Sequence, residues 1–402
     1  MVVNFPPDFL WGCSISSYQL EGNNFKSDWY FYEKEKHLEE AGQAVDYYNR
    51  FREDSSLAKK LGHNALRLSL EWARIYPAKH HIDEESLEHY KNLLIDLNDK
   101  GLKPLVTLNH FTLPFWFAKE GGWVNPHSVD CFMKYVVKVV KDLKSYADIW
   151  FTFNEPLVYI YNGFLIGRWP PGYKSLSLGL KALKNILNAH SLAYREIKRI
   201  YGEDLCLVSL TKHMRIFSPC YYFNFGQNNF LAFLRDRVFN FSLMNFFCNQ
   251  KLLDFIGLNY YCKEYVSFGN FLFGKDCNLP HHKGWKNTLG WFIFPEGLYE
   301  ILIKLKRYKL PIIITENGTS ELNNDDYFRF LYAHIRSLAK ALNEGVNVKG
   351  YFWWSLLDNF EWDEGYKHKF GLIEVDRRTF VRHIKPFALS YKNICERNAI
   401  EI

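Results

Sequence analysis

The sequence predicts an α/β protein built as a single (β/α)8 barrel, the TIM-barrel architecture, and two observations carry this prediction. Eight apolar runs typical of buried strands recur along the 402 residues, and most are followed by a helical pattern. Such alternation favours a closed barrel over an open sheet. On nearly every run the polar or ionisable side chain lies at or just beyond the C-terminal end. Barrel active sites are built at that rim, so an active site is expected there.

The strands are expected, in chain order, at residues 9–14, 64–70, 105–110, 147–154, 206–210, 253–261, 311–317 and 348–355. Helical patterns lie near residues 84–100, 180–201 and 295–309, with glycines or cations near their ends. Residues 212–250 are aromatic without a clear period. We interpret them as an insertion over the barrel mouth, with packing of their rings favoured over a ligand role. No linker or shift in composition divides the chain, so a single domain, residues 1–402, is expected.

Two of the strands end in the same way. Residues 151–156 (Phe-Thr-Phe-Asn-Glu-Pro) and 311–318 (Pro-Ile-Ile-Ile-Thr-Glu-Asn-Gly) each carry a Glu and an Asn after an apolar run. The runs are typical of parallel strands buried on both faces, and the Pro or Gly beyond them interrupts the regular structure. The polar groups at the other strand ends are Gln19 with Glu21, Arg67 with Glu71, His110, Asn259 with Tyr261, and Glu361.

Composition and charge exclude several classes of protein. A share of 48% hydrophobic and 23% charged residues is that of a soluble globular protein, and the net charge of +6 is small for this length. The basic run at residues 304–309 is more typical of a solvated last helical turn than of a nucleic-acid patch. No stretch approaches 18 uninterrupted apolar residues, so no membrane span is expected.

The eight cysteines are scattered without a C-x-x-C pair. This spacing predicts neither a zinc ribbon nor a disulfide framework, and several of the cysteines lie in apolar runs, where free thiols behave as small hydrophobic groups. The N-terminus has no basic segment followed by a long apolar one, so no signal peptide is expected. Together these features favour a reducing, cytoplasmic location.

Two carboxylates at one barrel rim suit the cleavage of glycosidic bonds. One carboxyl group protonates the departing oxygen, and the other attacks the anomeric carbon or activates water at it. Indole rings stack against the C–H face of a sugar, while amides and imidazole hydrogen-bond its hydroxyls. The 18% aromatic content fits such a site. A single Glu at a strand end is more often a salt-bridge partner, but two of them, each beside an Asn, favour catalysis.

The chain resembles glycoside hydrolase family 1, the retaining β-glucosidase and β-galactosidase family. Residues 152–156 and 314–318 resemble the two motifs that carry its catalytic carboxylates. Residues 9–12 with 17–22, 67–77 and 354–362 resemble its first, second and eighth strand regions, so the resemblance covers almost the whole chain. Residues 108–114 and 167–172 are most similar to archaeal members.

The resemblance implies a role for each matching residue. Glu155 would be the acid/base, Glu316 the nucleophile, and Arg67 and Tyr261 the groups that contact the nucleophile. Other matching positions would bind substrate, namely Gln19, His110, Asn154, Asn259, Trp291, Trp354, Glu361 and Trp362. Asn154 would hydrogen-bond the sugar 2-hydroxyl, Trp354 would lie under the terminal sugar, and Trp291 would line the leaving-group side. No metal and no organic cofactor is implied, so EDTA is expected to leave activity intact.

The expected function is therefore that of a retaining exo-β-glycosidase acting on terminal β-D-glucosyl, and also β-D-galactosyl or β-D-fucosyl, residues. The expected partner is a small β-glycoside, and a homo-oligomer is left open. The alternatives are a non-catalytic carbohydrate-binding relative, a structural protein on a barrel scaffold, and a 6-phospho-β-glycosidase. Both Glu residues oppose the first, the polar rim opposes the second, and Glu361 opposes the third because a carboxylate repels a 6-phosphate.

The chain departs from the family pattern in two respects. Phe111 stands where many members have Trp, so an indole N–H donor to the sugar is absent. The loops between residues 206 and 253 and around 318–330, which shape the leaving-group sites in the family, are short, so aglycone preference is the least transferable property. Trp11 and Trp72 are expected in the core. Surface or loop positions, rather than metal sites, are expected for His63, His213, His80 with His81, and His281 with His282.

Overall fold

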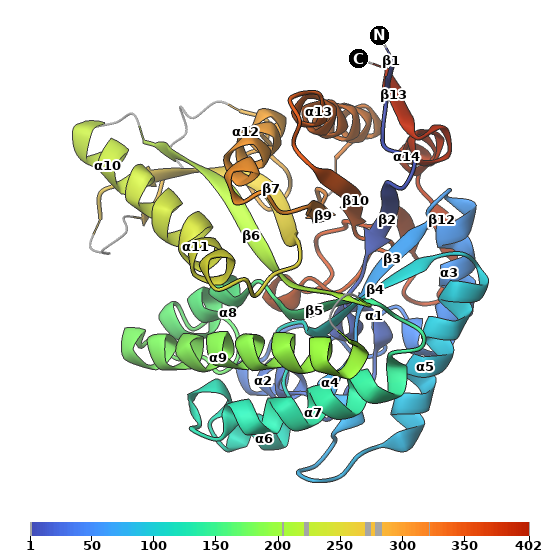
Figure 1. Ribbon diagram of the computed structural model, residues 1–402, viewed down its shortest axis with the longest axis vertical. Coiled ribbons are helices and arrows are strands. Elements are labelled where there is room, and N and C mark those ends of the chain that lie inside the picture. The colour runs from blue at the N-terminus through green and yellow to red at the C-terminus, as the bar shows by residue number, and fades with distance from the viewer. Residues whose placement is uncertain are drawn as a thin grey trace.

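Eight parallel strands close into a barrel in the computed structural model, which describes residues 2–202, 205–220, 225–269, 275–277, 284–320 and 322–401 (Figure 1). Around the ring the order is β6, β5, β4, β3, β2, β10, β9, β7, and β7 pairs again with β6. The barrel strands are β2 (Leu10–Ser14), β3 (Ala65–Ser69), β4 (Lys103–Asn109), β5 (Ile149–Asn154), β6 (Leu207–Pro219), β7 (Ile256–Ser267), β9 (Ile312–Asn317) and β10 (Val348–Trp354). Each predicted strand is present, and the predicted fold class is confirmed.

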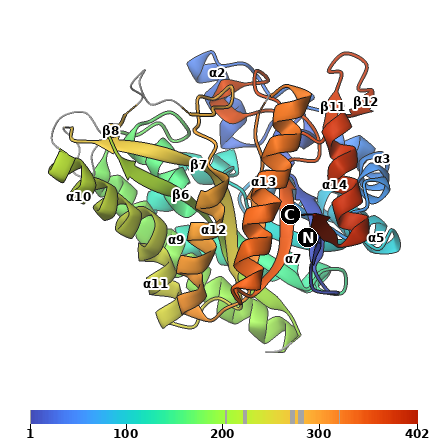
Figure 2. The ribbon, with the colours of Figure 1, turned by 90° about the horizontal axis from the view of Figure 1, so that it is seen from above.

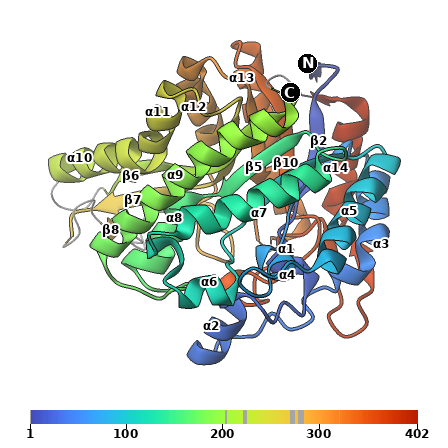
Figure 3. The same ribbon diagram turned by 60° about the horizontal axis from the view of Figure 1, so that its bottom comes forward.

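An outer layer of helices covers the barrel. It consists of α3 (Tyr47–Lys60), α5 (Glu84–Asp99), α7 (Ser128–Leu143), α9 (Leu176–Tyr201), α11 (Ser242–Asn249), α12 (Pro295–Leu305), α13 (Asn324–Asn343) and α14 (Pro386–Arg397). Helices α12 and α13 lie side by side over one part of the barrel (Figure 2). Helices α7 and α9 do the same in front of β5 (Figure 3). The basic run near residue 306 forms the end of α12 and the single turn η4 (Lys306–Tyr308), as predicted.

Shorter elements follow the C-terminal ends of the strands. They are α1 (Ser17–Glu21), α2 (Asp28–Lys36), α4 (Trp72–Ile75), α6 (Phe115–Lys119), η1 (Gly122–Val124), α8 (Pro156–Ile160), η2 (Tyr161–Leu165), α10 (Phe225–Arg235), η3 (Asp236–Phe241), β8 (Lys275–Asp276), η5 (Trp362–Glu364) and the hairpin of β11 (Ile373–Val375) and β12 (Arg382–Ile384). At the opposite end, β1 (Val2–Asn4) pairs with β13 (Ala399–Glu401), so the two ends of the described chain lie together.

The alternation of side chains along β3 explains how a charged residue enters the barrel. Leu66 and Leu68 face the helices and join the large apolar core between the two layers. Ala65 joins a small apolar cluster with residues of β4, β5, β9 and β10, which places it inside the barrel. Arg67 is two residues further along the strand, so it lies on the same inner face. Trp11 and Trp72, each 1% exposed, belong to the outer core as predicted.

Irregular pairing occurs where three strands reach the rim. β5 carries one residue more than β6 between Phe151 and Asn154, and β7 carries one more than β6 before Lys263. β9 carries an extra residue ahead of Glu316, relative to both neighbouring strands. Such bulges re-aim side chains and are common at barrel rims. They bring Asn154, Tyr261 and Glu316 out of simple alternation and toward the barrel axis.

The interpretation of residues 212–250 as an insertion over the mouth is wrong. Residues up to Pro219 continue β6, and α10, η3 and α11 then connect β6 to β7 on the outside of the barrel (Figure 1). The predicted strand ended too early because Lys212, His213 and Arg215 break the apolar pattern, although Lys212 and His213 are buried. Residues 221–224, which hold three of these aromatic side chains, lie outside the described residues, as do residues 270–274.

Cys220 and Cys277 form a disulfide bond, with their Cα atoms 6.2 Å apart. The prediction of unpaired cysteines is therefore wrong for this pair. Both residues flank β7, since the Cys220 amide bonds the Val266 carbonyl and the Cys277 amide bonds that of Tyr265. This juxtaposition across 57 residues of sequence has no local signal. Disulfides are uncommon in reducing compartments, so the pair bears on the cytoplasmic location, which stays a prediction. Within the described ranges, no helix has the length and apolar character that crossing a membrane requires.

Candidate active site

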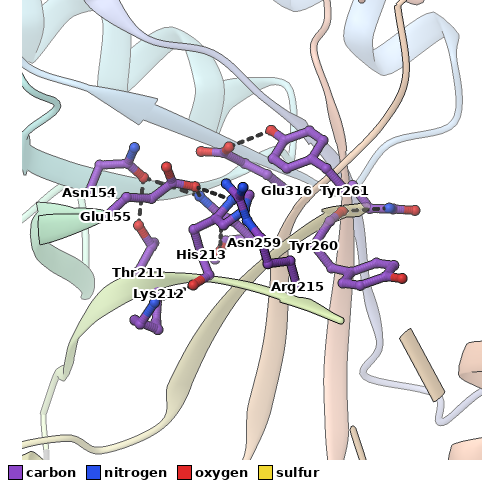
Figure 4. A network of polar contacts seen from close by, with 12 residues as sticks. Asn154, Glu155, Thr211, Lys212, His213, Arg215, Asn259, Tyr260, Tyr261 and Glu316 are labelled. Atoms are coloured by element: carbon purple, nitrogen blue, oxygen red, sulfur yellow. Dashed lines mark hydrogen bonds and ion pairs between the residues drawn. The ribbon is translucent and has the colours of Figure 1, made fainter. Parts of the chain in front are cut away.

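The polar residues predicted to form a site converge at the C-terminal ends of the barrel strands (Figure 4). Arg67 comes from β3 and His110 directly follows β4. Asn154 ends β5 and Glu155 directly follows it, while Tyr261 comes from β7 and Glu316 from β9. All six are less than 8% exposed. Burial of this many polar groups is costly unless each has a partner, so their contacts decide how the site is organised.

Glu316 is held by two donors from different strands. The Arg67 guanidinium donates through Nη1 to Glu316 Oε1 and forms a buried ion pair. The Tyr261 hydroxyl donates to Glu316 Oε2 over 2.6 Å. Both carboxylate oxygens are thereby occupied, one by a cation and one by a phenol, and this arrangement favours the ionised form of Glu316.

Asn154 has a fixed amide orientation. Its Oδ1 accepts hydrogen bonds from Arg67 Nη2 at 2.7 Å and from the Thr211 hydroxyl at 2.5 Å, with Asn259 Nδ2 at 3.4 Å. Its Nδ2 lies 3.2 Å from His110 Nε2. Since donors surround Oδ1, the amide nitrogen has to face His110. Arg67 therefore orients both Asn154 and Glu316.

Glu155 lies at the junction between β5 and α8 in a left-handed backbone conformation, with φ 43° and ψ 62°. Pro156 begins α8 immediately after it, where a proline suits the first helical turn. Non-glycine residues rarely adopt this conformation, and the few that do cluster at functional sites. Phe111 and Trp362, at φ 73° and 51°, share this property. The Glu155 amide donates to the Thr211 carbonyl over 3.0 Å, which anchors the junction to β6.

The carboxyl group of Glu155 has neutral partners. Asn259 Nδ2 donates to Glu155 Oε1 over 2.7 Å, while Asn259 Oδ1 accepts from the Thr315 hydroxyl at 2.6 Å. His213 Nδ1 lies 3.3 Å from the same Oε1 atom. Asn259, predicted to bind substrate, thus points its amide at Glu155.

Burial raises the pKa of both carboxyl groups above the usual range for Glu. At Glu316 the Arg67 charge and the Tyr261 hydrogen bond oppose this rise, whereas the neighbouring charge of Glu155 adds to it. At Glu155 the Asn259 hydrogen bond and the charges of Lys212, Arg67 and Arg215 oppose the rise. Because the two groups repel each other's charge, they titrate as a pair, and the direct contact with Arg67 favours placing the single negative charge on Glu316.

A second cluster joins α1 to the segment after β10. Gln19 Nε2 donates to the Phe360 carbonyl at 2.7 Å and lies 3.4 Å from Glu361 Oε2. Its Oε1 accepts from the Ser16 hydroxyl at 2.6 Å, which fixes the amide. Burial, followed by the nearby charge of Glu316, raises the pKa of Glu361 to about 8. Glu361 therefore belongs to the same electrostatic system as the two central carboxyl groups.

The aromatic residues form a wall beside these groups. The His110 ring is nearly parallel to Trp354 and to Trp362, with centroids 5.9 and 6.2 Å away. Phe111 contacts Trp362 at 5.3 Å. Trp291 is partly exposed and meets the Tyr261 ring at 5.6 Å. Every predicted site residue thus contacts, or influences the charge of, at least one other member of the group.

The structure corrects two of the histidine predictions. His63 is 1% exposed in the core, and burial lowers its pKa to about 3. His213 is 5% exposed and faces Glu155, so it belongs to the site rather than to the surface. The signal for His213 was present but ambiguous, because a polar residue in the middle of an unrecognised strand looks like a loop residue. His281 and His282 lie outside the described residues.

Comparison with known proteins agrees with this arrangement. The family model described as glycosyl hydrolase family 1 matches residues 1–223 and 230–400. Beta-glucosidase A of Thermotoga maritima is 32% identical, over 100% of this chain and 99% of that protein. A beta-galactosidase of Pyrococcus woesei is 28% identical, with 98% of each covered. The solved beta-glycosidase from Pyrococcus horikoshii superposes with a TM-score of 0.91 at 33% identity, covering 100% of this chain and 97% of that one. The chain therefore belongs to glycosyl hydrolase family 1 and is an enzyme of the β-glycosidase type.

Proposed function

We propose that this chain is a retaining exo-β-glycosidase that removes terminal non-reducing β-D-glucosyl, and also β-D-galactosyl or β-D-fucosyl, residues. One observation carries the proposal, namely the contrast between the two central carboxyl groups. Glu316 receives a guanidinium and a phenol, whereas Glu155 receives an amide and lies beside an imidazole. Pairs of carboxyl groups whose surroundings separate their protonation states are the mark of an acid and a nucleophile.

The reaction proceeds in two displacements. The Glu316 carboxylate attacks the anomeric carbon while the bond to the aglycone oxygen breaks, and Glu155 gives its proton to that oxygen. Glu155, now ionised, takes a proton from water as the water oxygen attacks the same carbon. The bond to Glu316 breaks, the sugar leaves with its original configuration, and both residues return to their starting states. The bonds from Arg67 and Tyr261 stabilise Glu316 as a free carboxylate at the start and at the end.

The remaining residues would bind the terminal sugar. Asn154 presents its amide nitrogen beside His110, as a donor to a sugar hydroxyl requires, and a hydrogen bond at the 2-hydroxyl strengthens in the transition state. Gln19 and Glu361 form an adjacent polar pair for other hydroxyls. The indoles of Trp354 and Trp362 suit the C–H face of the ring. We place Trp291 on the leaving-group side because it is partly exposed beyond Tyr261.

The pattern at Glu361 supports an unphosphorylated substrate. Its carboxyl group lies among Glu316, Glu155, Asp363 and Glu364, whose charges raise its pKa. A 6-phosphate there would lie near the negative charges of Glu316, Asp363 and Glu364, with Gln19 as the neutral partner. We therefore favour neutral sugars over phosphorylated ones.

The experiment is trapping with a 2-deoxy-2-fluoro-β-glucoside that carries a dinitrophenolate leaving group. The fluorine slows both steps, and the good leaving group lets the first step outrun the second, so a glycosyl-enzyme accumulates. Mass spectrometry of the digested protein should show the added sugar on the peptide that contains Glu316. An adduct on another residue, or turnover without any adduct, would contradict the proposal.

A further inference from the structure

Strand β6 presents three alternate residues to the catalytic groups (Figure 4). The Thr211 hydroxyl donates to Asn154 Oδ1 over 2.5 Å, and His213 Nδ1 lies 3.3 Å from Glu155 Oε1. Arg215 Nε donates to His213 Nε2 over 3.0 Å. Residues two apart on a strand share one face, so β6 gives these three side chains a common direction. His213 and Arg215 have no role in the two displacements described above.

Arg215 determines which nitrogen of His213 carries the proton. A guanidinium only donates hydrogen bonds, so Nε2, which it contacts, has to be an acceptor without a proton. Burial, together with the charges of Arg215 and Lys212, lowers the pKa of His213 well below its usual range and keeps the ring neutral. A neutral imidazole has one N–H, and here it lies on Nδ1, the nitrogen that is 3.3 Å from Glu155 Oε1.

Arg215 is itself held on several sides. Its Nη1 donates to Glu264 Oε2 over 2.5 Å, and Glu264 also pairs with Arg235 at 2.6 Å. Asn240, fully buried on η3, accepts from the Arg215 amide at 3.2 Å and donates to its carbonyl at 2.8 Å. The arginine lies opposite the irregular pairing of β7, where its backbone would otherwise lack regular partners. These contacts make Arg215 a rigid donor to the imidazole.

His213 and Asn259 therefore approach the same oxygen of the acid. Asn259 donates to Oε1 over 2.7 Å and the His213 Nδ1 atom lies 3.3 Å from it, while none of the described residues donates a hydrogen bond to Oε2. A proton on Oε1 would face these two donors, whereas a proton on Oε2 meets none of them. We propose that His213, oriented by Arg215, is a positioning residue that confines the acid proton to Oε2 of Glu155. This inference rests on the proposed role of Glu155 as the acid.

Several charged or titratable groups surround this pair and enter its pH dependence. Lys212 donates to the His213 carbonyl, and its pKa is lowered to about 7 by burial. The Tyr261 ring stacks on His213 with centroids 5.7 Å apart, and the Phe239 ring meets His213 edge-on at 5.9 Å. The groups facing Glu155 or His213 from the neighbouring elements are Arg67 of β3, Lys212 and Arg215 of β6, Tyr261 and Glu264 of β7, Glu316 of β9, and Glu361 after β10.

The test compares wild type with His213→Phe and His213→Asn. Phe fills the space between Tyr261 and Phe239 without a donor, whereas the Asn amide nitrogen stands where Nδ1 lies. Each protein is assayed on phenyl β-glucoside, whose departure needs a proton, and on 2,4-dinitrophenyl β-glucoside, whose departure does not. His213→Phe should lose roughly 10–100-fold in kcat/KM on the first and about threefold or less on the second. His213→Asn should recover most of the loss.

The pH dependence of kcat/KM provides a second test. A purely structural role of His213 would leave its alkaline limb unchanged. A donor to Oε1 favours the ionised acid, so its removal should move the alkaline limb of kcat/KM upward by roughly half to one pH unit. Equal losses on both substrates, or an unmoved limb, would overturn the inference. If His213→Phe does not fold, His213→Gln replaces it, since Gln keeps an acceptor for Arg215 but loses the donor to Glu155. Failure of wild type to cleave either glucoside would contradict the proposed function instead.

Discussion

Glu316 accepts hydrogen bonds from a guanidinium and a phenol, whereas Glu155 accepts from an amide and lies beside a neutral imidazole. The two residues follow similar sequence patterns. In each, an apolar run is followed by a carboxylate and an amide, in either order. Their own strands therefore give them the same position relative to the barrel, and the neighbouring strands make them different. β3 supplies the cation for one, and β6 and β7 supply neutral donors for the other.

The positive charges near the two carboxyl groups also differ in whether they make direct contact. The Arg67 side chain touches Glu316 directly and reaches Glu155 only through its field, while Lys212 and Arg215 also act on Glu155 from a distance. A direct ion pair favours the charged state much more than a distant charge does. The comparison predicts that substitutions around Glu316 affect all substrates, and that substitutions around Glu155 affect those that need an acid.

Loss of Glu316, the proposed nucleophile, should have the largest effect. Glu316→Gln keeps the size of the side chain but cannot attack, so kcat on an aryl β-glucoside should fall by about 10⁴-fold or more. Glu71→Gln is the matched control, because Glu71 is a fully buried carboxyl at a strand end that contacts Thr112 and Ser17 rather than the site. Comparable losses of kcat in both variants would contradict a specific role of Glu316 in the reaction.

Loss of Glu155, the proposed acid, should be selective. Glu155→Gln should lower kcat/KM by roughly 10²–10⁴-fold on phenyl β-glucoside, since general acid catalysis contributes about that much. The loss on 2,4-dinitrophenyl β-glucoside should be much smaller in the glycosylation step. Steady-state assays on both substrates measure this, and a uniform loss would assign Glu155 another role.

Loss of the phenol at Glu316 should be intermediate. Tyr261→Phe removes a hydrogen bond to a charged group, which is worth roughly 10–100-fold in rate. That bond lowers the pKa of Glu316, so its removal raises this pKa and moves the acid limb of kcat/KM to higher pH. An acid limb that stays in place would show that Tyr261 does not tune the nucleophile.

The smallest effect concerns stability and Glu361. Its pKa is about 8 in the folded chain against an ordinary value of 4.5. Below pH 4.5 both states hold the proton, and between pH 4.5 and about 8 only the folded state does, so this contribution to stability is present at low pH and is lost as pH rises from 4.5 through 8. In Glu361→Gln the difference between the free energies of unfolding at pH 5 and pH 8 should shrink by about 1–2 kcal/mol, a modest value because the side chain is partly exposed. Urea unfolding at both pH values measures it, and an unchanged difference would contradict the raised pKa.

Much of the fold and the centre of the site could be predicted because their signals are local. The apolar runs before Asn154 and before Glu316 identify two strands without any knowledge of their neighbours. The site then follows from the rule that barrel strands present their C-terminal ends together. Arg67 entered the prediction from its place in a strand and from the motif around it.

What could not be predicted depends on contacts between distant segments. His213 gained its role from Arg215 and from β7, and no local pattern distinguishes it from a loop histidine. The bulges next to Asn154 and Glu316 result from pairing with adjacent strands. The disulfide between Cys220 and Cys277 likewise depends on where β7 and β8 pair.

The two carboxyl groups are expected to have different roles, and azide rescue distinguishes these roles by the product that forms. Glu316→Ala and Glu155→Ala are each given an activated aryl β-glucoside with sodium azide, and the glycosyl azide formed is identified by NMR. In Glu316→Ala, azide replaces the nucleophile and should give the α-glycosyl azide. In Glu155→Ala, azide attacks the glycosyl-enzyme and should give the β-glycosyl azide. The same anomer from both variants, or the reverse assignment, would contradict the account.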